Sequence, residues 1–160
     1  MITHTKEVKP TINPANATFR ELFEEKENAI YYIPNFQRSY AWDIEPHVTQ
    51  FLTDLSDCYE IEKLEGDPYQ HFLGQIILRH AEEKQQGTEI KFEVIDGQQR
   101  LITFMMVCIV IYKHAHAIMK LNRSLQGRVE KIMDSINTII FFEKSPRLLL
   151  SRKDHRYWED

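Results

Sequence analysis

The sequence predicts a single α+β domain in which a small mixed sheet packs on a buried central helix. Residues 29–33 (AIYYI) and 90–95 (IKFEVI) have the β-branched and aromatic composition of strands. Residues 101–112 (LITFMMVCIVIY) are apolar except for Thr103, which is typical of a helix buried on all sides. In a chain of 160 residues, 42% of them hydrophobic, these elements indicate one domain with one core.

Composition and charge argue against several classes of protein. The net charge of −4 disfavours bulk electrostatic binding of nucleic acid, so any such contact requires a local patch. The two cysteines, Cys58 and Cys108, give no disulfide framework and predict a reduced, cytoplasmic protein. Cys108 lies in the apolar run and is expected to be inert, and the histidines form no metal-ligand spacing. No apolar leader is visible, and residues 101–112 are too few for a membrane span, which needs about 20.

The first part of the chain is expected to be a polar arm over residues 1–17, followed by the domain over residues 18–160. Thr18 and Glu21 fit a capping box that opens a short helix. The strand over residues 29–33 leads into a loop, after which Asp43 is expected to cap a helix. Six residues recur at helical spacing and predict that one face of this helix packs: Val48, Phe51, Leu52, Leu55, Cys58 and Tyr59.

The second part begins with a charged connecting loop, predicted over residues 60–69. Residues 71–79 and 90–95 predict an antiparallel pair of strands around a polar turn. After the central helix, an amphipathic helix is marked by Leu125, Val129, Ile132, Met133, Ile136 and Ile140. Residues 147–151 predict a last short strand. The charged ending at Asp160 predicts a truncated chain, the N-terminal part of a longer protein.

The strongest local signal is the run Asp96-Gly97-Gln98-Gln99-Arg100, between a predicted strand and the central helix. Glycine permits a tight turn, and a helix N-terminus offers free N–H groups to phosphate. Arg100 could add a bidentate contact, Gln98 and Gln99 could orient water or read a base edge, and Asp96 could hold a metal ion. The alternative is a capping box in which Asp96 caps the helix and Gln99 reaches back. Such polar side chains against an apolar helix require partners or a cleft.

A second segment, residues 33–43 (IPNFQRSYAWD), interleaves aromatic residues with Gln37 and Arg38. Tyr40 or Trp42 could stack on a base, and Arg38 could bind phosphate. The alternative is a structural corner in which the aromatic residues anchor the turn and the polar residues face solvent. The sequence favours neither interpretation over the other.

Two further segments have weaker signals. Gly74, inside FLGQI, indicates a bulge or a close approach by backbone or ligand, and close packing on the central helix is the favoured interpretation. Residues 146–154 place three basic residues beside a possible edge strand, and a solvated face is favoured there.

Four blocks, in this order and spacing, resemble one family. They are IPxxQRxYxW, FLGxI, VIDGQQRLxT and PRLLLSRKD. Together they look like the DGQQR-signature domain that forms the N-terminal half of GmrSD-type modification-dependent restriction enzymes and of the related anti-phage protein SspE. The resemblance covers residues 18–154, and it implies a fold similar to the ParB and sulfiredoxin group.

The resemblance also implies an activity, which is binding and hydrolysis of nucleoside triphosphates, with Mg²⁺, coupled to sensing of modified DNA. A separate C-terminal domain, often an HNH nuclease, cuts the DNA in such systems. The implied catalytic residues are Asp96, Gln98, Gln99 and Arg100, with Asp96 as the metal ligand. The implied nucleotide-binding residues are Gln37, Arg38, Tyr40, Gly97 and Arg100.

Two alternatives from other functional classes remain open. One is an interaction domain in which the DGQQR run is purely structural. The other is a DNA-binding module without turnover, in which four arginines contact backbone phosphates: Arg38, Arg100, Arg147 and Arg152.

Overall fold

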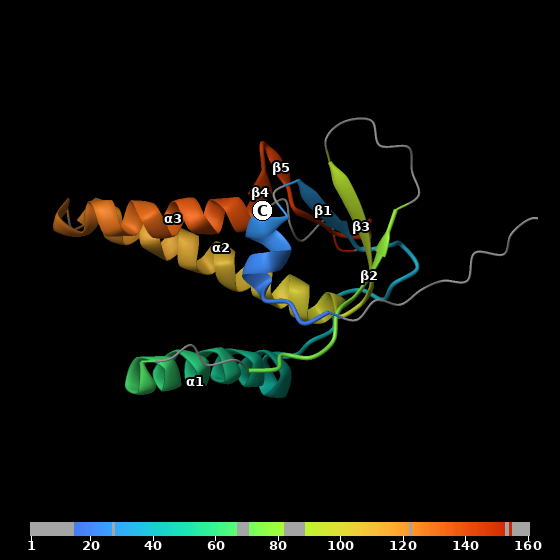
Figure 1. The fold of residues 1–160 in the computed structure, drawn as a ribbon, viewed down its shortest axis with the longest axis horizontal. Helices are drawn as coiled ribbons and strands as arrows, with labels where there is room; N and C mark the ends of the chain where they lie inside the picture. Colours follow the sequence, from blue (N-terminus) through green and yellow to red (C-terminus); the bar gives the residue numbers. More distant parts are fainter. Residues whose placement is uncertain are drawn as a thin grey trace, which may run out of the picture.

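A four-stranded mixed sheet and a pair of long helices make up the mixed α+β fold that the sequence predicts (Figure 1). The computed structural model describes residues 15–26, 28–66, 71–81, 89–121, 123–152 and 154. The expected arm therefore lies outside the described residues except for residues 15–17, and the expected polar turn lies outside them over residues 82–88.

The sheet has the strand order β2-β3-β1-β6. Its strands are β1 (Ala29–Tyr32), β2 (Ile77–His80), β3 (Ile90–Asp96) and β6 (Leu148–Leu149). β1 runs parallel to β3 and to β6, and β2 runs antiparallel to β3. The predicted strands over residues 29–33 and 90–95 are therefore confirmed, and the one predicted over residues 147–151 is present only as Leu148–Leu149. A small separate hairpin is made by β4 (Phe141–Phe142) and β5 (Ser145–Pro146).

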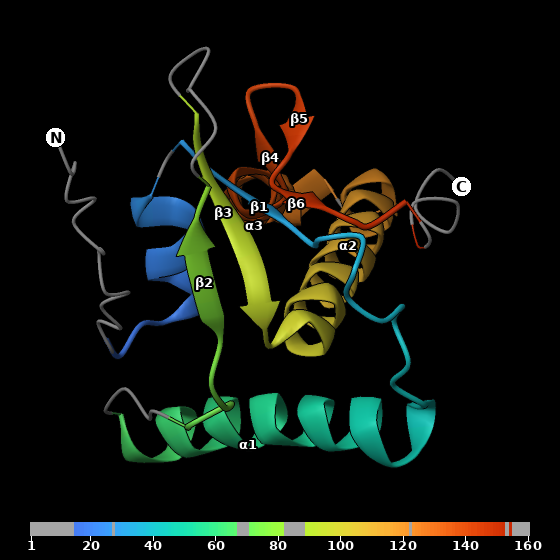
Figure 2. The same ribbon diagram turned by 90° about the vertical axis from the view of Figure 1, so that its right-hand side faces the viewer.

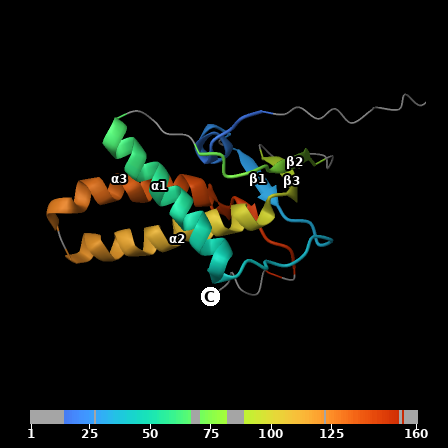
Figure 3. The same cartoon turned by 90° about the horizontal axis from the view of Figure 1, so that it is seen from below.

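The helices lie beside and below the sheet (Figure 2). They are η1 (Glu21–Glu25), η2 (Ile44–Val48), α1 (Thr49–Glu65), α2 (Gln98–Leu121), η3 (Arg123–Leu125) and α3 (Gln126–Ile140). The capping box predicted for the first of them is present, because the Glu21 N–H donates to Thr18 Oγ1 at 3.2 Å and the Glu21 carboxylate accepts from Thr18. α2 and α3 lie side by side and project away from the sheet (Figures 1 and 3).

The expected strand over residues 71–79 is wrong for its first part. Residues 71–76 are irregular, and pairing with β3 begins only at Ile77. Gly74 has φ +103°, which no regular strand contains, so the chain turns there before it enters β2.

The predictions for α1 need two corrections. The helix continues to Glu65 and ends where Gly66 adopts φ +78°, so the loop expected from residue 60 begins later. The predicted packing face is confirmed only in part. Phe51 is buried, and Val48, Leu55 and Cys58 are partly buried, whereas Leu52 and Tyr59 are 44% and 63% exposed. α1 lies below the rest of the domain (Figure 1), and its packed face is narrower than the helical spacing predicts.

Asp43 precedes η2 in extended conformation, but its side chain makes no capping hydrogen bond, so that prediction is wrong. Thr49 supplies local bonds instead, because its hydroxyl lies 3.0 Å from Ile44 O and 2.7 Å from Glu45 Oε1, and both oxygens are acceptors.

The central helix is longer and less buried than expected. α2 has 24 residues, so by length and composition alone it is long and apolar enough to cross a membrane. In the structure, 33% of its most apolar 18-residue stretch is buried. Leu101, Ile102 and Met105 belong to the core beside the sheet, while Val110 and Ile118 are exposed on the projecting part. Its first half is therefore the core helix, where the side chains of residues 98–109 are all buried or partly buried, so the predicted all-round burial is only approached there.

The core joins the sheet, η1 and the first half of α2. Tyr31 on the central strand is fully buried, and its hydroxyl donates to Leu22 O at 2.6 Å. Burial raises the pKa of this phenol to about 12. Phe19 stacks on Phe104 of α2, with ring centroids 3.9 Å apart.

Arg147 is buried, at 2% exposure, so the favoured interpretation of residues 146–154 as a solvated face is wrong for this residue. Its guanidinium donates to Thr138 O and Phe141 O near the end of α3. It also donates to Lys26 O and Ala29 O, where the chain enters β1. The arginine thus fastens the C-terminal carbonyls of α3 to the start of the central strand.

We expect Arg147→Ala to lower the free energy of unfolding by at least about 3 kcal/mol, because it removes a buried charged donor that four carbonyl groups share. Urea denaturation followed by circular dichroism measures the change. The matched control is Arg152→Ala, because that side chain is exposed and its loss should cost less than about 0.5 kcal/mol. Equal effects of the two substitutions would contradict the assigned role.

The two cysteines should differ in reactivity. Burial raises the pKa of the Cys108 thiol to about 11, so at about pH 8 it is almost entirely protonated and shielded. Cys58 is only half-buried. Mass spectrometry after iodoacetamide treatment should show Cys58 labelled at least roughly tenfold faster, with the difference lost in denaturant. Equal labelling rates in the folded protein would refute this.

Candidate functional site

The DGQQR turn, residues 96–100, lies where β3 passes into α2. Gly97 has φ +85°, and its carbonyl accepts the N–H of Leu101 at 3.2 Å, so Gly97 is the residue that caps the helix. A Cβ at this glycine would lie 2.9 Å from Gln75 O and 3.1 Å from Ile76 Cα. On that face the neighbouring chain fills the space that a ligand would need.

Gln98 and Gln99 are each 6% exposed, and their amides bind the backbone of the QR loop, residues 33–43. Gln98 Nε2 donates to Arg38 O at 2.9 Å. Gln99 Oε1 accepts from Ala41 N at 2.9 Å, and its Nε2 donates to Ser39 O at 3.4 Å. The expectation that these glutamines require partners is confirmed. The capping-box alternative is wrong, because Gln99 reaches the QR loop and Gly97 occupies the cap.

The QR loop is also fastened by Gln37 and Tyr40. Gln37 Nε2 donates to Ile95 O at 2.8 Å, at the end of β3. The Thr103 hydroxyl donates its proton to Gln99 O at 2.8 Å, so the 2.9 Å contact with the Tyr40 hydroxyl is a bond that Tyr40 donates. Tyr40 is therefore half-buried and bound to α2, whereas the Arg38 side chain is exposed.

Residues after β6 support the same loop from its other side. The Asp154 carboxylate is buried and accepts from the Ser151 hydroxyl at 3.2 Å and from Tyr40 N at 3.4 Å. Asn35 Oδ1 accepts from Arg152 N at 3.1 Å. The blocks that the resemblance singled out therefore meet in space, although they are far apart in the sequence.

A pocket of about 300 Å³ opens beside this assembly, and we call it the Arg100 pocket. Its lining residues are Trp42, Pro46, His47, Gln50, Phe51, Asp54, Leu73 and Arg100. Trp42 stacks on His47 with ring centroids 5.8 Å apart, and it lies tilted to Phe51 at 6.0 Å. The pocket therefore combines an aromatic wall with a guanidinium group.

The Arg100 side chain is held in the pocket by a bond to the backbone. Arg100 Nη1 donates to Gln75 O at 3.1 Å, which anchors one corner of the guanidinium. The carboxylate that lines the same pocket, Asp54, lies 3.7 Å from His71 Nε2. The pocket is therefore lined by charges of both signs, the carboxylate of Asp54 and the guanidinium of Arg100.

Of the residues that the sequence singled out as ligand-binding candidates, Trp42 and Arg100 line this pocket. Gln37, Tyr40, Gln98 and Gln99 instead hold the QR loop on α2, and Asp96 lies exposed at the end of β3. Sequence reasoning missed the part of the lining contributed by η2 and α1. The repeated apolar spacing around Phe51 indicated a packed face, but it could not show that this face would meet Arg100.

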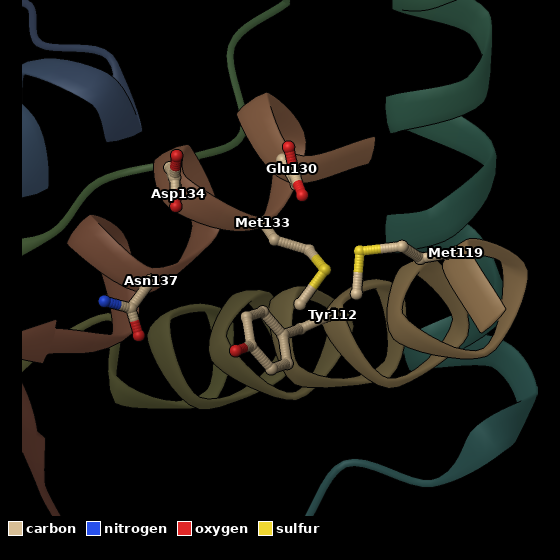
Figure 4. Close-up of a pocket in the computed structure, with 6 residues that line it drawn as sticks. All are labelled: Tyr112, Met119, Glu130, Met133, Asp134 and Asn137. Carbon is tan, nitrogen blue, oxygen red and sulfur yellow. The ribbon is translucent and has the colours of Figure 1, made fainter. Parts of the chain in front are cut away.

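Another cavity, of about 250 Å³, lies between α2 and α3 (Figure 4). Met119 and Met133 point toward each other across it, with Tyr112 beside them (Figure 4). The carboxylates Glu130 and Asp134 also line it, and they would repel a phosphate group. Among the described residues no group of three potential metal-ligating side chains occurs, here or near the DGQQR turn.

The fold and the Arg100 pocket define a mixed α+β domain with a ligand-sized pocket at a strand-to-helix junction. Residues 19–159 match the family described as the GmrSD restriction endonuclease, N-terminal domain, and the chain belongs to this family. It is therefore part of a restriction system that acts on DNA. The resemblance drawn from the four sequence blocks is thereby confirmed. No curated protein matches the chain, and a fold kinship with ParB and sulfiredoxin stays a prediction.

We expect Gln99→Ala to lower the free energy of unfolding by about 1–3 kcal/mol, because it removes a buried amide together with both of its bonds to the QR loop. Limited proteolysis should cut the loop faster, and urea denaturation measures the stability. Gln126→Ala is the control, since that exposed amide bonds Glu130 on its own helix and should cost less than about 0.5 kcal/mol. An unchanged loop cleavage rate in Gln99→Ala would contradict the role.

Proposed function

We propose that this chain binds a nucleoside triphosphate in the Arg100 pocket and acts as the nucleotide-hydrolysing sensor of a modification-dependent restriction system. The observation that carries the proposal is the position of the Arg100 guanidinium in the same pocket as Trp42 and Phe51. A nucleotide offers a flat base and an anionic phosphate chain, which are the complements of these two features.

The size of the pocket supports a nucleotide fragment as its occupant. A volume of about 300 Å³ is at the small end of ligand pockets, so it would enclose a base or a phosphate group, with the rest of the nucleotide outside. The indole of Trp42 contacts the rings of His47 and Phe51, and a base stacked on an aromatic side chain gains about 1–3 kcal/mol.

The proposed roles of the motif residues follow from their positions. Arg100 would neutralise charge on the transferred phosphoryl group. Gln98 and Gln99, which hold the QR loop, would act on hydrolysis by fixing Trp42, and Gln98 Oε1, which has no hydrogen-bond partner among the described residues, would be the atom that orients water. Gln37, Arg38, Tyr40 and Gly97 would contribute to binding through the loop and the turn.

Mg²⁺ is proposed to enter with the nucleotide. The described residues offer no three-ligand cage, but Mg²⁺ is commonly held by one or two carboxylates together with phosphate oxygens. The exposed Asp96 carboxylate fits such a single ligand, and Asp54 supplies a carboxylate in the pocket itself. When bound, the ion would neutralise charge on the phosphate oxygens.

The finer assignments within the restriction system are part of the proposal. Modified DNA would be sensed, and a C-terminal nuclease domain of HNH type would cut it in the cytoplasm. A DNA-binding role without nucleotide turnover has less support, because one of the four arginines that it requires, Arg147, is buried and bound to carbonyl groups. The net charge of −4 also disfavours it.

Thermal unfolding with ATP, GTP, CTP or UTP and Mg²⁺ tests the proposal. One nucleotide at a concentration about 100 times its Kd should stabilise the chain by about 2.7 kcal/mol, which raises Tm by about 5 °C or more. Arg100→Ala should abolish the rise. Arg128→Ala, which removes the same charge from an exposed site on α3, should keep it.

Fluorescence locates the bound nucleotide. The chain has two tryptophans, Trp42 and Trp158, so Trp158→Phe leaves Trp42 as the only indole. Nucleotide should quench its emission, with the same concentration dependence as the rise in Tm. A chain that shows neither effect with any of the four nucleotides does not have the proposed function.

A further inference from the structure

The guanidinium of Arg100 lies directly against the backbone at Gly74. A Cβ added to this glycine would be 2.7 Å from Arg100 Cζ, 2.8 Å from Nε and 2.9 Å from Nη2. Real Cβ atoms essentially never approach other atoms this closely. We propose that Gly74 is a positioning residue, whose missing side chain lets Arg100 lie on the backbone of residues 74 and 75 with its remaining N–H groups available to a phosphate. This inference rests on the proposed function.

The contact is specific to the charged end of one side chain. All three atoms nearest to the place that a Cβ would take at Gly74 belong to the guanidinium of Arg100. At Gly97, by contrast, the nearest atoms include Gln75 O and Ile76 Cα, which are backbone. A methyl group at Gly97 would therefore force the chain apart. A methyl group at Gly74 would meet a flexible side-chain end, so Arg100 would move while the fold remains.

The same segment fixes the direction of the guanidinium. Arg100 Nη1 donates to Gln75 O at 3.1 Å, one residue beyond the glycine, and Leu73, one residue before it, lines the pocket. Nε and Nη2 have no hydrogen-bond acceptor among the described residues. A guanidinium held at one corner keeps its planar fork of donors in place, so less rotamer entropy is lost when an anion binds.

This geometry also explains why a glycine interrupts the segment before β2. Its φ of +103° turns the chain within residues 71–76, close to Arg100 in the first turn of α2, before pairing with β3 begins. Backbone conformation alone would favour glycine there. The distances to Arg100 add a second requirement, which is empty space for the guanidinium, and the two requirements can be separated experimentally.

The test is a double-mutant cycle on nucleotide affinity, with a matched control for backbone strain. Gly66→Ala is that control, because Gly66 also has positive φ, at +78°, but nothing lies within 4 Å of its Cβ position. Wild type, Gly74→Ala, Arg100→Ala, the double variant and Gly66→Ala are titrated with the nucleotide that raises Tm most, in the Trp158→Phe background. Circular dichroism and urea denaturation establish that each variant is folded.

We expect Gly74→Ala to weaken nucleotide binding about tenfold or more, close to the effect of Arg100→Ala. The double variant should bind no more weakly than Arg100→Ala, because the two changes remove the same interaction. Gly66→Ala should stay within about twofold of wild type.

Each contrary result has a distinct meaning. If Gly74→Ala binds nucleotide as wild type does, the positioning role is wrong and the proposed function stands. The role is equally wrong if Gly66→Ala weakens nucleotide binding as much as Gly74→Ala does. It is also wrong if the fold-losses of affinity of Gly74→Ala and Arg100→Ala multiply in the double variant. If wild type binds none of the four nucleotides, the proposed function fails, and the role of Gly74 toward phosphate fails with it.

Discussion

The docking of the QR loop on the first turn of α2 is the interaction on which the candidate site depends. Gln98 and Gln99 lie in the core at 6% exposure, where an unpaired amide costs about 1–3 kcal/mol. The loop backbone binds Gln98 Nε2 and both polar atoms of the Gln99 amide, whereas Gln98 Oε1 is buried without a hydrogen-bond partner among the described residues. Because Trp42 directly follows the bound stretch, the same bonds fix the indole near Phe51 and Arg100. The Arg100 pocket therefore depends on the hydrogen bonds that the buried Gln98 and Gln99 amides make with the QR loop.

The DGQQR turn divides its tasks among neighbouring residues. Gly97 gives the turn its positive φ. Because it has no side chain, the backbone of Gln75 and Ile76 can lie close to it, and a Cβ at Gly97 would push that backbone away. Gln98 and Gln99 hold the QR loop, so the loop would be released if the bonds to it were exchanged for bonds to a ligand. Arg100 is one residue further along the helix and points to the other segment, where Gln75 O takes one of its donors. A single turn of helix can serve structure and binding because successive side chains leave it in different directions.

The sequence predicts the helices and strands better than the long-range hydrogen bonds that join them. Alternation in β3 and helical spacing in α3 are local, so the strands, the helices and the junction at Gly97 could be predicted. Bonds such as Gln98 to Arg38, 60 residues apart, have no local signal, and only the need for some partner could be foreseen. The burial of Arg147 escapes prediction for the same reason, because a basic residue beside a strand is usually solvated and its four carbonyl partners come from the end of α3 and from the start of β1. The family blocks supply the long-range information that periodicity lacks.

The place of α1 follows from the same pocket. η2 and α1 provide Pro46, His47, Gln50, Phe51 and Asp54, while the body of the domain provides Leu73 and Arg100. Within the described residues, Phe51 is the buried side chain of α1, so this helix is held by few contacts of its own. A ligand that filled the proposed pocket would touch both parts at once, and its binding free energy would add to the stability of their contact. Occupancy of the Arg100 pocket and the position of α1 would then be linked, and the link would be reciprocal, because an α1 held in place would bind the same ligand more tightly.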